Sequence, residues 1–540
     1  MHDEAGQRYQ ATLPAHQRRV GGVFYTPADV ATGLVRIALD GVAIRPPRQP
    51  TVCDPACGAG ALLLAAADAL EAAGHDPVTI VEDLIWGADI DPVAVGVARD
   101  SLAAWAGARG STAVARHVVA ADSLDAVAPA WPSPPPAGFD LVVGNPPFQS
   151  QLATPTTRST RRAAAAREQF GSVAAPYADS ATLFLVHGCE LAAPGGRVAM
   201  IQPESVLSAR DAGPARRSLL ARASLVGLWW AGEPVFDAGV RVCAPVLALD
   251  GPGDPPDRTV RRWRGRRFEP VAVAARGSVA AGDSWSHLLG VMQGTPEVDL
   301  GAGPTLADLA TSTAGFRDEY YGVAPYVREA GGWSGRERTD AVRLVTSGLI
   351  DPLHCRWGST STRFSRTTWT APVVDLEGLR AADARLAGWA DQRLVPKVVL
   401  AGQTRVVEAA VDVDGRWWPS VPTIAVAPRS GEVADLWRIA AVLSAPAATA
   451  WALAHYGGAA LSSGAVKLSA AQVLGLPLPP DQAAWEAGAA AAASGHHAAV
   501  ADDQVGWRAS LDLLAEAMGD AYRVGSPVAA WWAARRPPWR

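Results

Sequence analysis

The segment at residues 51–73 constrains the fold more than any other part of this chain. It begins with a short apolar strand, passes through the turn Asp54-Pro55-Ala56-Cys57-Gly58-Ala59-Gly60, and becomes a helix rich in alanine and leucine. A strand that leads through a glycine-rich turn into a helix is typical of an open α/β sheet. Glycines let the backbone approach a ligand closely, and the helix start offers unpaired N–H groups. The turn therefore suits a nucleotide-like cofactor.

Two familiar phosphate-binding patterns are absent from this turn. Gly58-Ala59-Gly60 lacks the third glycine of the dinucleotide fingerprint at its usual spacing. A P-loop is also excluded, because no Gly-Lys-Ser or Gly-Lys-Thr follows. A pyrophosphate ligand is therefore disfavoured.

Polar residues follow three later strands at the points where these strands end. Asp89 follows an apolar run at residues 83–88, and Asp122 follows another at residues 116–121. The carboxyl ends of strands in an open α/β sheet are where ligands bind, so these acids converge on one rim. There Asp89 would grip a ribose diol and Asp122 would accept a proton from an adenine amino group. Each acid alone fits a helix N-cap equally well.

The third of these strands, at residues 139–144, leads into Asn145-Pro146-Pro147-Phe148. Two prolines fix the backbone angle φ, so the amide oxygen of Asn145 and the carbonyl of Pro146 can be held facing one point. Each oxygen accepts one N–H, and Phe148 offers a flat face for a planar ring. The tetrapeptide alone fits a plain proline turn as well. The cofactor turn and the two acids before it favour a binding site for an exocyclic amino group.

Together these segments resemble the S-adenosylmethionine-dependent DNA amino-methyltransferases, specifically the γ-class adenine-N6 enzymes of restriction-modification systems. The order of the motifs is specific, because Tyr25-Thr26-Pro27 precedes the glycine turn as in that class. Thr26 also fits a helix N-cap, with Pro27 at the first helical position. Residues 182–203 resemble the family's next helix and strand, and residues 229–249 resemble its last sheet hairpin.

The resemblance spans about residues 21–250 and implies a Rossmann-like class I methyltransferase domain. Such an α/β domain has a mixed, mostly parallel sheet with helices on both faces. It also implies roles for single residues. In relatives the turn holds the methionine end of the cofactor, the Tyr-Thr segment closes that pocket, and the later positions bind the ribose and adenine. The matching residues here are Tyr25, Thr26, Asp54, Ala56, Gly58, Gly60, Asp89, Ile90, Asp122 and Asn145.

The resemblance also implies that Asn145, Pro146, Pro147 and Phe148 form the catalytic centre. An adenine amino group is a poor nucleophile, because its lone pair is delocalised into the ring. Hydrogen bonds from both its N–H groups to Asn145 and Pro146 would favour a tetrahedral nitrogen and direct in-line displacement. The base must be flipped out of duplex DNA and stacked on Phe148. Phe236 matches a second aromatic at the flipped base, and it fits an ordinary core position as well.

The net charge of −5 argues against a generally basic nucleic-acid binder, so a DNA surface requires local arginine. One candidate group, Arg158, Arg161, Arg162 and Arg167, follows the tetrapeptide. A second surrounds Trp263 and contains Arg258, Arg261, Arg262, Arg264, Arg266 and Arg267. Lys397 and Lys467 are the only lysines and are further candidates for phosphate or base contacts. A solvated surface explains all of these charges equally well.

The length of 540 residues predicts more than one domain. We place the catalytic methyltransferase domain at residues 1–250 and a linker rich in proline, glycine and aspartate at residues 251–257. Residues 258–540 are expected to form an α+β target-recognition domain with a helical carboxyl-terminal part. Short segments at residues 311–316 and 461–480 resemble such domains.

Five cysteines without a Cys-x-x-Cys pair predict neither a zinc site nor a disulfide framework, and we expect no metal. Cys53 and Cys57 do not form the nucleophile arrangement of cytosine-C5 enzymes, and we expect them to be small packing residues. No membrane-length apolar run or signal segment is visible, so a cytoplasmic enzyme is expected.

The expected partners are duplex DNA and, since no nuclease domain is apparent, a separate restriction endonuclease or defence-system subunit. Three alternatives remain open. The chain would then be a protein glutamine-N5 methyltransferase, an RNA amino methyltransferase, or a non-catalytic DNA-binding subunit that keeps a cofactor fold.

Overall fold

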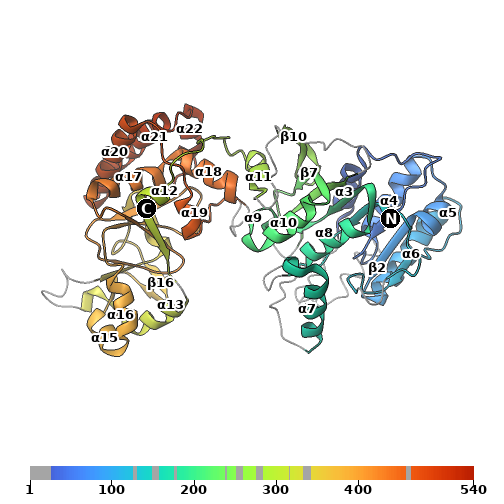
Figure 1. Ribbon diagram of the computed structural model, residues 1–540, viewed down its shortest axis with the longest axis horizontal. Helices are drawn as coiled ribbons and strands as arrows, with labels where there is room; N and C mark the ends of the chain where they lie inside the picture. Colours follow the sequence, from blue (N-terminus) through green and yellow to red (C-terminus); the bar gives the residue numbers. More distant parts are fainter. Residues whose placement is uncertain are drawn as a thin grey trace. The chain divides into compact units, whose positions relative to one another are not determined.

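The computed structural model describes residues 26–125, 130–148, 157–174, 179–236, 240–250, 259–274, 284–315, 317–332, 342–457 and 464–539 (Figure 1). The chain divides into two compact units, Met1–Met292 and Gln293–Arg540. Within the described ranges no single helix has the length and apolar character needed to cross a membrane, although one bent helix pair passes the same test jointly.

The first unit is built on one mixed sheet with the order β10-β9-β7-β8-β5-β4-β1-β2-β3, and β6 pairs with β8. The run from β5 to β3 is parallel, as is the pair β7–β9, whereas β8 is antiparallel to both of its neighbours. The strands are β1 (Val52–Asp54), β2 (Ile85–Asp89), β3 (Val118–Ala120), β4 (Phe139–Gly144), β5 (Ala192–Met200), β6 (Gln202–Pro203), β7 (Ala223–Trp230), β8 (Val242–Leu249), β9 (Val260–Arg264) and β10 (Glu269–Ala274). The predicted mixed, mostly parallel sheet is confirmed.

Helices cover both faces of this sheet, because its central strands are apolar on both sides. Leu141 and Val143 of β4 pack in one core with α3 (Ala28–Leu39), α4 (Ala61–Ala72) and α6 (Pro92–Gly107). Val142, between them, belongs to the opposite core with α8 (Ser180–Leu191) and α10 (Gly213–Leu220), which lie side by side (Figure 1). All three β4 side chains are fully buried, and each stabilises the fold by about 1.5–3 kcal/mol.

Short helices complete the first unit. They are α5 (Pro77–Thr79), a π-helix (Ile80–Leu84), α7 (Thr157–Phe170), a 3-10 turn (Gly171–Ala174), α9 (Ser205–Ser208), a second 3-10 turn (Arg210–Ala212) and α11 (Ser286–Met292). Cys53 and Cys57 lie in the two cores of this unit, as expected of small packing residues.

The first unit extends further along the chain than the predicted boundary at residue 250. Residues 251–257 lie outside the described ranges, but the strands that follow them return to the same sheet. Trp263 of β9 is buried beside Gly227 of β7, where a Cβ would lie only 2.7 Å from the indole ring. The proline-rich segment was predicted to separate two domains, but it connects two strands of the same unit. Composition cannot distinguish these cases, because turn residues occur both in linkers and in loops within a domain.

The second unit combines two small sheets with a helical layer. The first sheet has the antiparallel order β11 (Ala310–Ala314), β22 (Ile424–Pro428), β19 (Lys397–Leu400) and β20 (Ala409–Asp412). The second has the order β12 (Val327–Glu329), β18 (Pro372–Val374), β13 (Val342–Val345) and β21 (Trp417–Pro419). Two short hairpins join β14 (Ile350–Asp351) with β15 (His354–Cys355) and β16 (Thr362–Phe364) with β17 (Thr367–Trp369).

The helical part of this unit lies mainly near its carboxyl end, as predicted. Its helices are α12 (Leu306–Leu309), α13 (Arg317–Val323), α15 (Leu376–Ala382), α16 (Ala384–Asp391), α17 (Val433–Ser444), α18 (Pro446–Tyr456), α19 (Ala470–Leu474), α20 (Gln482–Val500), α21 (Gln504–Ala521) and α22 (Ser526–Ala533). Three 3-10 turns occupy Ala324–Tyr326, Ala330–Gly332 and Ser347–Leu349. Residues 304–314 and 466–478 lie together, because Leu306 N donates to Leu476 O and Ser312 Oγ donates to Ala470 O.

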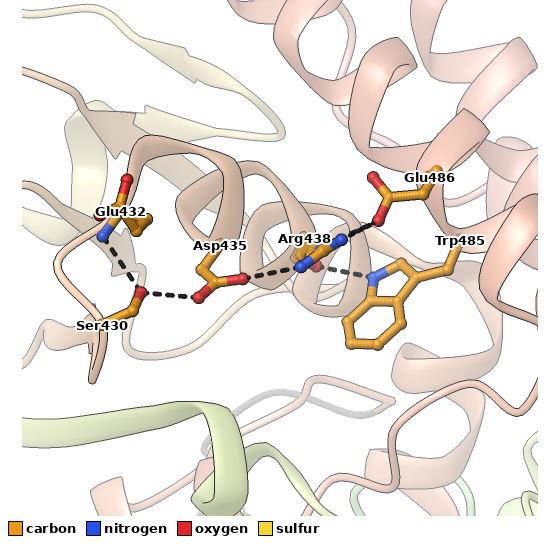
Figure 2. A network of polar contacts seen from close by, with 6 residues as sticks. All are labelled: Ser430, Glu432, Asp435, Arg438, Trp485 and Glu486. Atoms are coloured by element: carbon orange, nitrogen blue, oxygen red, sulfur yellow. Dashed lines mark hydrogen bonds and ion pairs between the residues drawn. The ribbon is translucent and has the colours of Figure 1, made fainter.

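A polar network holds α17 against α20 (Figure 2). Arg438 lies between Asp435 on its own helix, 3.0 Å away, and Glu486 on α20, 2.7 Å from its Nε atom. The indole Nε1 of Trp485 donates to the Arg438 carbonyl at 3.1 Å. The hydrogen bonds to both carboxylates raise the pKa of Arg438. The network fixes the register of two helices whose apolar faces are rich in small alanines.

Lys397, a predicted DNA contact, is buried in the second unit. Its Nζ atom lies 2.5 Å from Asp412 Oδ2, and each side chain is only 1% exposed. Asp412 also accepts hydrogen bonds from the backbone N–H groups of Arg416 and Trp417, at 3.0 and 2.9 Å. The prediction of a phosphate contact was therefore wrong for Lys397, because adjacent strands β19 and β20 supply an internal partner.

Replacement of Asp412 by alanine should destabilise the second unit by about 3–5 kcal/mol, because Lys397 would keep a buried charge without its carboxylate. Urea unfolding followed by tryptophan fluorescence measures this change. The exposed Asp520→Ala variant serves as the control and should stay within about 0.5 kcal/mol of the wild type. A loss below about 1 kcal/mol in Asp412→Ala would contradict the structural role of the pair.

Candidate active site

The predicted tetrapeptide starts where β4 ends, and its first side chain is held by a residue before α3. Asn145 Nδ2 donates to the hydroxyl oxygen of Thr26 at 3.0 Å, and Thr26 is buried. In the structure the amide nitrogen faces Thr26, so the amide oxygen is turned the other way. The structure thus joins two predicted site residues that lie 119 positions apart in the chain.

The expected N-cap role of Thr26 was wrong. Helix α3 begins at Ala28, and Pro27 occupies the N-cap position without a side-chain hydrogen bond. The Thr26 hydroxyl instead contacts Asn145. The motif fits a cap locally, but the site provides a competing partner that lies far away in the sequence.

Ser180 supports the tetrapeptide from α8. Its hydroxyl donates to the Pro147 carbonyl at 2.5 Å, and Asp179 caps the same helix by accepting from Ala181 N at 2.9 Å. Pro146 is buried, so the backbone of the tetrapeptide is fixed from both sides. Sequence reasoning missed Ser180, although its place directly before an apolar helix was a usable signal for a helix start.

Phe148 and Phe236 meet edge to face. Their ring centroids are 6.3 Å apart and their planes are inclined by 66°, a favourable geometry for an aromatic pair. Phe236 is buried in the core, and Phe148 is partly buried against that core. The structure therefore brings the two predicted aromatics together, and Phe236 also serves as a core residue.

Two carboxylates connect the glycine turn to the next strand. Asp54 accepts from Ala56 N at 3.0 Å, and Asp89, at the end of β2, accepts from Gly58 N at 2.9 Å. The second oxygen of Asp89 accepts from Asp91 N, also at 2.9 Å. Since a carboxylate has about four acceptor positions, Asp89 keeps capacity for a ligand hydroxyl. Asp89 is not the N-cap of the next helix. Asp91 caps α6 instead, by accepting a hydrogen bond from Val93 N.

Burial governs the charge of these two acids. Asp54 is 1% exposed, and burial raises its pKa from the ordinary 3.8 to about 8, with a further contribution from the charge of Asp89. Burial also raises the pKa of Asp89, although its backbone hydrogen bonds oppose this shift. A cationic group placed beside Asp54 would lower its pKa and would itself be stabilised.

The surroundings of the turn fit a nucleoside-like ligand. A Cβ on Gly58, whose φ is +50°, would meet nothing within 4 Å, so the space beside the turn is open. Gly60 has φ +88°, and a Cβ there would come to 3.0 Å from Ala98. Both the backbone conformation and the close contact therefore favour glycine at this position. Ile90, next to Asp89, is 62% exposed and presents an apolar face for a planar ring.

The third acid, Asp122, lies at the same edge. It accepts from Leu124 N at 3.3 Å, and the neighbouring Ser123 hydroxyl donates to Pro55 O at 2.7 Å. This buried hydrogen bond ties the end of β3 to the glycine turn. The three strand-end acids therefore surround the turn as predicted, although their ligand contacts remain predictions.

Several predicted residues cannot be placed at this site. Tyr25 and Arg258 lie outside the described residues. Arg158, Arg161 and Arg162 belong to helix α7, but their side chains are outside the described part. Lys467, in the second unit, is exposed, and so is Arg167 on α7.

The arginines around Trp263 serve the first unit internally. Arg261 pairs with Asp40, and Arg266 forms two hydrogen bonds with Asp29, at 2.7 and 2.8 Å. Arg262 is buried in β9. These arginines hold the edge of the sheet against α3, so a phosphate-binding surface fits them poorly. The internal role of Arg261 and Arg266 depends on their pairing with Asp40 and Asp29, which lie far away in the sequence. Arg264 and Arg267 are exposed.

In the described part of the chain, no three His, Cys, Asp or Glu side chains gather in a geometry that could hold a metal ion. All five cysteines are free thiols.

Comparison with known proteins finds one family model that matches most of the first unit. Residues 2–248 match the family model described as N-6 DNA Methylase. The Type IIL restriction-modification enzyme MmeI in complex with DNA is a structural neighbour, with 14% identity and a TM-score of 0.59. This match covers 98% of this chain and 80% of the MmeI chain.

Two further structures share the fold over most of this chain. The DrdV–DNA complex has 14% identity and a TM-score of 0.51, covering 91% of this chain and 58% of that one. A nuclease-deletion mutant of the Type ISP restriction-modification enzyme LlaGI, in complex with a DNA substrate mimic, has 11% identity and a TM-score of 0.51. It covers 88% of this chain and 47% of that one. At such identities the likeness concerns the fold.

Replacement of Asp54 by asparagine should stabilise the protein increasingly as pH rises from 4 to 8. The raised pKa means that the folded protein holds the proton more tightly than the unfolded chain does. The stability from this group is therefore complete below pH 3.8 and is lost as pH rises toward 8. Asparagine keeps an acceptor for Ala56 N but carries no charge.

The difference in the free energy of unfolding between Asp54→Asn and the wild type should grow by at most about 1.4 kcal/mol per pH unit. Urea unfolding at a series of pH values measures it, and the exposed Asp125→Asn variant should follow the wild type. A difference that is constant or shrinks with pH would refute the assignment of a buried, proton-binding carboxyl.

Proposed function

Because residues 2–248 match the N-6 DNA methylase family model, we propose that this protein transfers a methyl group from S-adenosylmethionine to N6 of adenine in duplex DNA. The observation that carries the proposal is the orientation of Asn145. Its amide nitrogen is bound to Thr26, at the edge of the sheet where the glycine turn and three strand-end acids lie. An amide oxygen and the Pro146 carbonyl beside it match the two N–H donors of an adenine amino group.

The cofactor fits the residues at the glycine turn. S-adenosylmethionine, when bound, supplies a methyl group made electrophilic by the adjacent sulfonium. We assign Asp54 to the positive methionine end, because its buried carboxyl gains most from a cation. Asp89 would bind the ribose hydroxyls, exposed Ile90 would cover the adenine ring, and Asp122 would accept from the ring's amino group. Tyr25, Thr26, Ala56, Gly58 and Gly60 would line the methionine pocket.

Asn145 and Pro146 would act directly on the substrate amino group. When both N–H bonds are directed to fixed acceptors, the lone pair of the nitrogen is localised and points away from them. When bound, S-adenosylmethionine would supply its methyl group to this lone pair by direct displacement from sulfur, and the amino group would release one proton to water. The chain needs no covalent enzyme intermediate, which agrees with the burial of Cys53 and Cys57 in the cores.

Phe148 and Phe236 would hold the extruded base. Phe148 is only partly buried, so its ring is available for stacking, while buried Phe236 supports it from the side. Stacking would offset the few kcal/mol that unstacking a base costs. Lys467 and the arginines of α7 remain candidates for contacts with the DNA phosphates, which would not depend on the base sequence.

The likeness of the whole chain to a restriction-modification enzyme bound to DNA, and to the DrdV–DNA complex, favours DNA over a protein glutamine or RNA substrate. It also favours a target-recognition role for the second unit, which we place at residues 293–540. We also propose a cytoplasmic role in restriction-modification or phage defence, with the nuclease on a separate chain; the likeness to restriction-modification enzymes supports the first of these roles.

The proposal predicts that the purified protein transfers label from methyl-labelled S-adenosylmethionine to unmodified genomic DNA, and that nucleoside analysis finds it in N6-methyladenine. Asn145→Ala should lower the transfer rate at least about 100-fold, because one of two acceptors is lost. Cofactor affinity, measured separately, should fall far less than the transfer rate, because the other cofactor-binding residues are unchanged.

Matched incubations with RNA and with protein extract test the rival substrates. Label found only in glutamine residues or only in RNA would overturn the DNA assignment. Tight cofactor binding with no transfer to any substrate would instead indicate a non-catalytic subunit. Full transfer by Asn145→Ala would overturn the catalytic role of the tetrapeptide.

A further inference from the structure

The second unit contains an open polar groove with a volume of ≈ 470 Å³. Its walls come from three places in the chain: residues 347–356, the segment at residues 403–408 after β19, and the residues 535–538 that follow α22. We call it the arginine groove, after the four arginines that line it: Arg356, Arg405, Arg535 and Arg536.

The charge of the arginine groove is opposite to that of the whole chain. Its lining includes four arginines but only two acids, Asp351 and Glu408, whereas the chain carries a net charge of −5. Asp351 is bound at 2.8 Å to Arg356, and both are buried in the floor. Arg536 pairs with Asp512 outside the lining, at 2.8 Å. Arg405 and Arg535 therefore remain against one acid of the lining, Glu408, which leaves a net positive charge.

Arg535 is held in place by backbone groups. Its Nη2 atom donates to Gly464 O at 2.5 Å and its Nε atom donates to Arg405 O at 3.3 Å. Burial and the nearby charge of Arg405 lower the pKa of Arg535. Two arginines of like charge thus line the same groove, and an anion bound there would relieve their repulsion. Arg405 itself is exposed and can reach a ligand.

The chemistry of the lining fits phosphate groups of a polymer. Guanidinium groups bind phosphate oxygens in a bidentate manner, and Ser, Thr and Gln side chains are usual partners of nucleic-acid backbones. The groove supplies Ser347, Gln403 and Thr404 beside the arginines. Its open form suits a chain that continues on both sides.

We propose that the arginine groove binds phosphates of the DNA backbone and so adds affinity that is independent of base sequence. The proposal deepens the proposed function and rests on it, because the phosphates are those of the methylated duplex. It contrasts with the arginines around Trp263, where Asp29 and Asp40 already neutralise the guanidinium groups.

Arg405→Ala and Arg405→Glu test the proposal with little risk to folding. The Arg405 side chain is exposed, and its backbone carbonyl, which binds Arg535, stays in both variants. The control is Arg508→Ala, which removes an exposed arginine of α21 that does not line the groove. Thermal unfolding of all three variants checks that the fold is retained.

Fluorescence anisotropy with a labelled 20-base-pair duplex, measured over a range of salt concentrations, gives the affinity and its salt dependence. Loss of one phosphate contact should lower the slope of log Kd against log salt by about 0.9 in Arg405→Ala. At 0.1 M salt this corresponds to about eightfold weaker binding, and Arg405→Glu should bind more weakly still. Arg508→Ala should match the wild type in affinity and slope.

Methyl transfer by the wild type to unmodified genomic DNA separates the two proposals. If transfer occurs but both Arg405 variants keep wild-type affinity and slope, the groove assignment is overturned and the proposed function stands. If the Arg405 variants bind DNA more weakly but the wild type transfers no methyl group, the groove assignment stands and the proposed function fails. If the wild type binds no duplex, both are overturned.

Discussion

The candidate site depends on the parallel pairing of β3, β2, β1 and β4. Parallel neighbours end at the same edge of a sheet, so their backbone hydrogen bonds alone bring Asp122, Asp89, Asp54 and Asn145 to one rim. Short side-chain contacts then fix the rim: Asp89 binds Gly58 N, Ser123 binds Pro55 O, and Thr26 binds Asn145. Without the parallel register these residues would have no reason to meet.

This arrangement carries a cost in stability that agrees with a binding role. The rim contains a fully buried carboxyl at Asp54, which is unfavourable in the protein by itself. The two glycines of the turn have positive φ, a conformation that glycine adopts without steric strain. The surrounding apolar cores compensate for the buried acid, since the central strands are buried on both faces. A ligand with a positive centre would recover part of the cost at Asp54. We therefore regard the glycine turn and the buried acid as one functional unit.

Much of the first unit could be predicted from the sequence, because local signals and the sheet agree there. Apolar runs before Asp89, Asp122 and Asn145 identify the strands, and the structure confirms them within a few residues. Residues whose role depends on distant partners could not be predicted. Lys397 appears to be a surface charge until β20 places Asp412 beside it.

The same reason explains the other differences. Nothing near Arg261 or Arg266 in the sequence indicates that their partners are Asp40, just after α3, and Asp29, within α3. Likewise, Thr26 fits a helix cap locally, and only the fold offers Asn145 as a partner. The proline-rich composition of residues 251–257 predicts a linker, but it gives no information on whether the chain returns to the same sheet, as β9 does. Long-range pairing, not local propensity, decides each of these cases.

The central claim is that Thr26 orients the Asn145 amide so that its oxygen faces the adenine amino group. The most direct measurement is the single-turnover rate of methyl transfer to unmodified DNA by Thr26→Val and Thr26→Ser, with cofactor affinity measured in parallel. Valine cannot accept the Asn145 hydrogen bond, so the rate should fall about tenfold or more, whereas serine should restore it. A wild-type rate in Thr26→Val, or a change confined to cofactor affinity, would contradict the account.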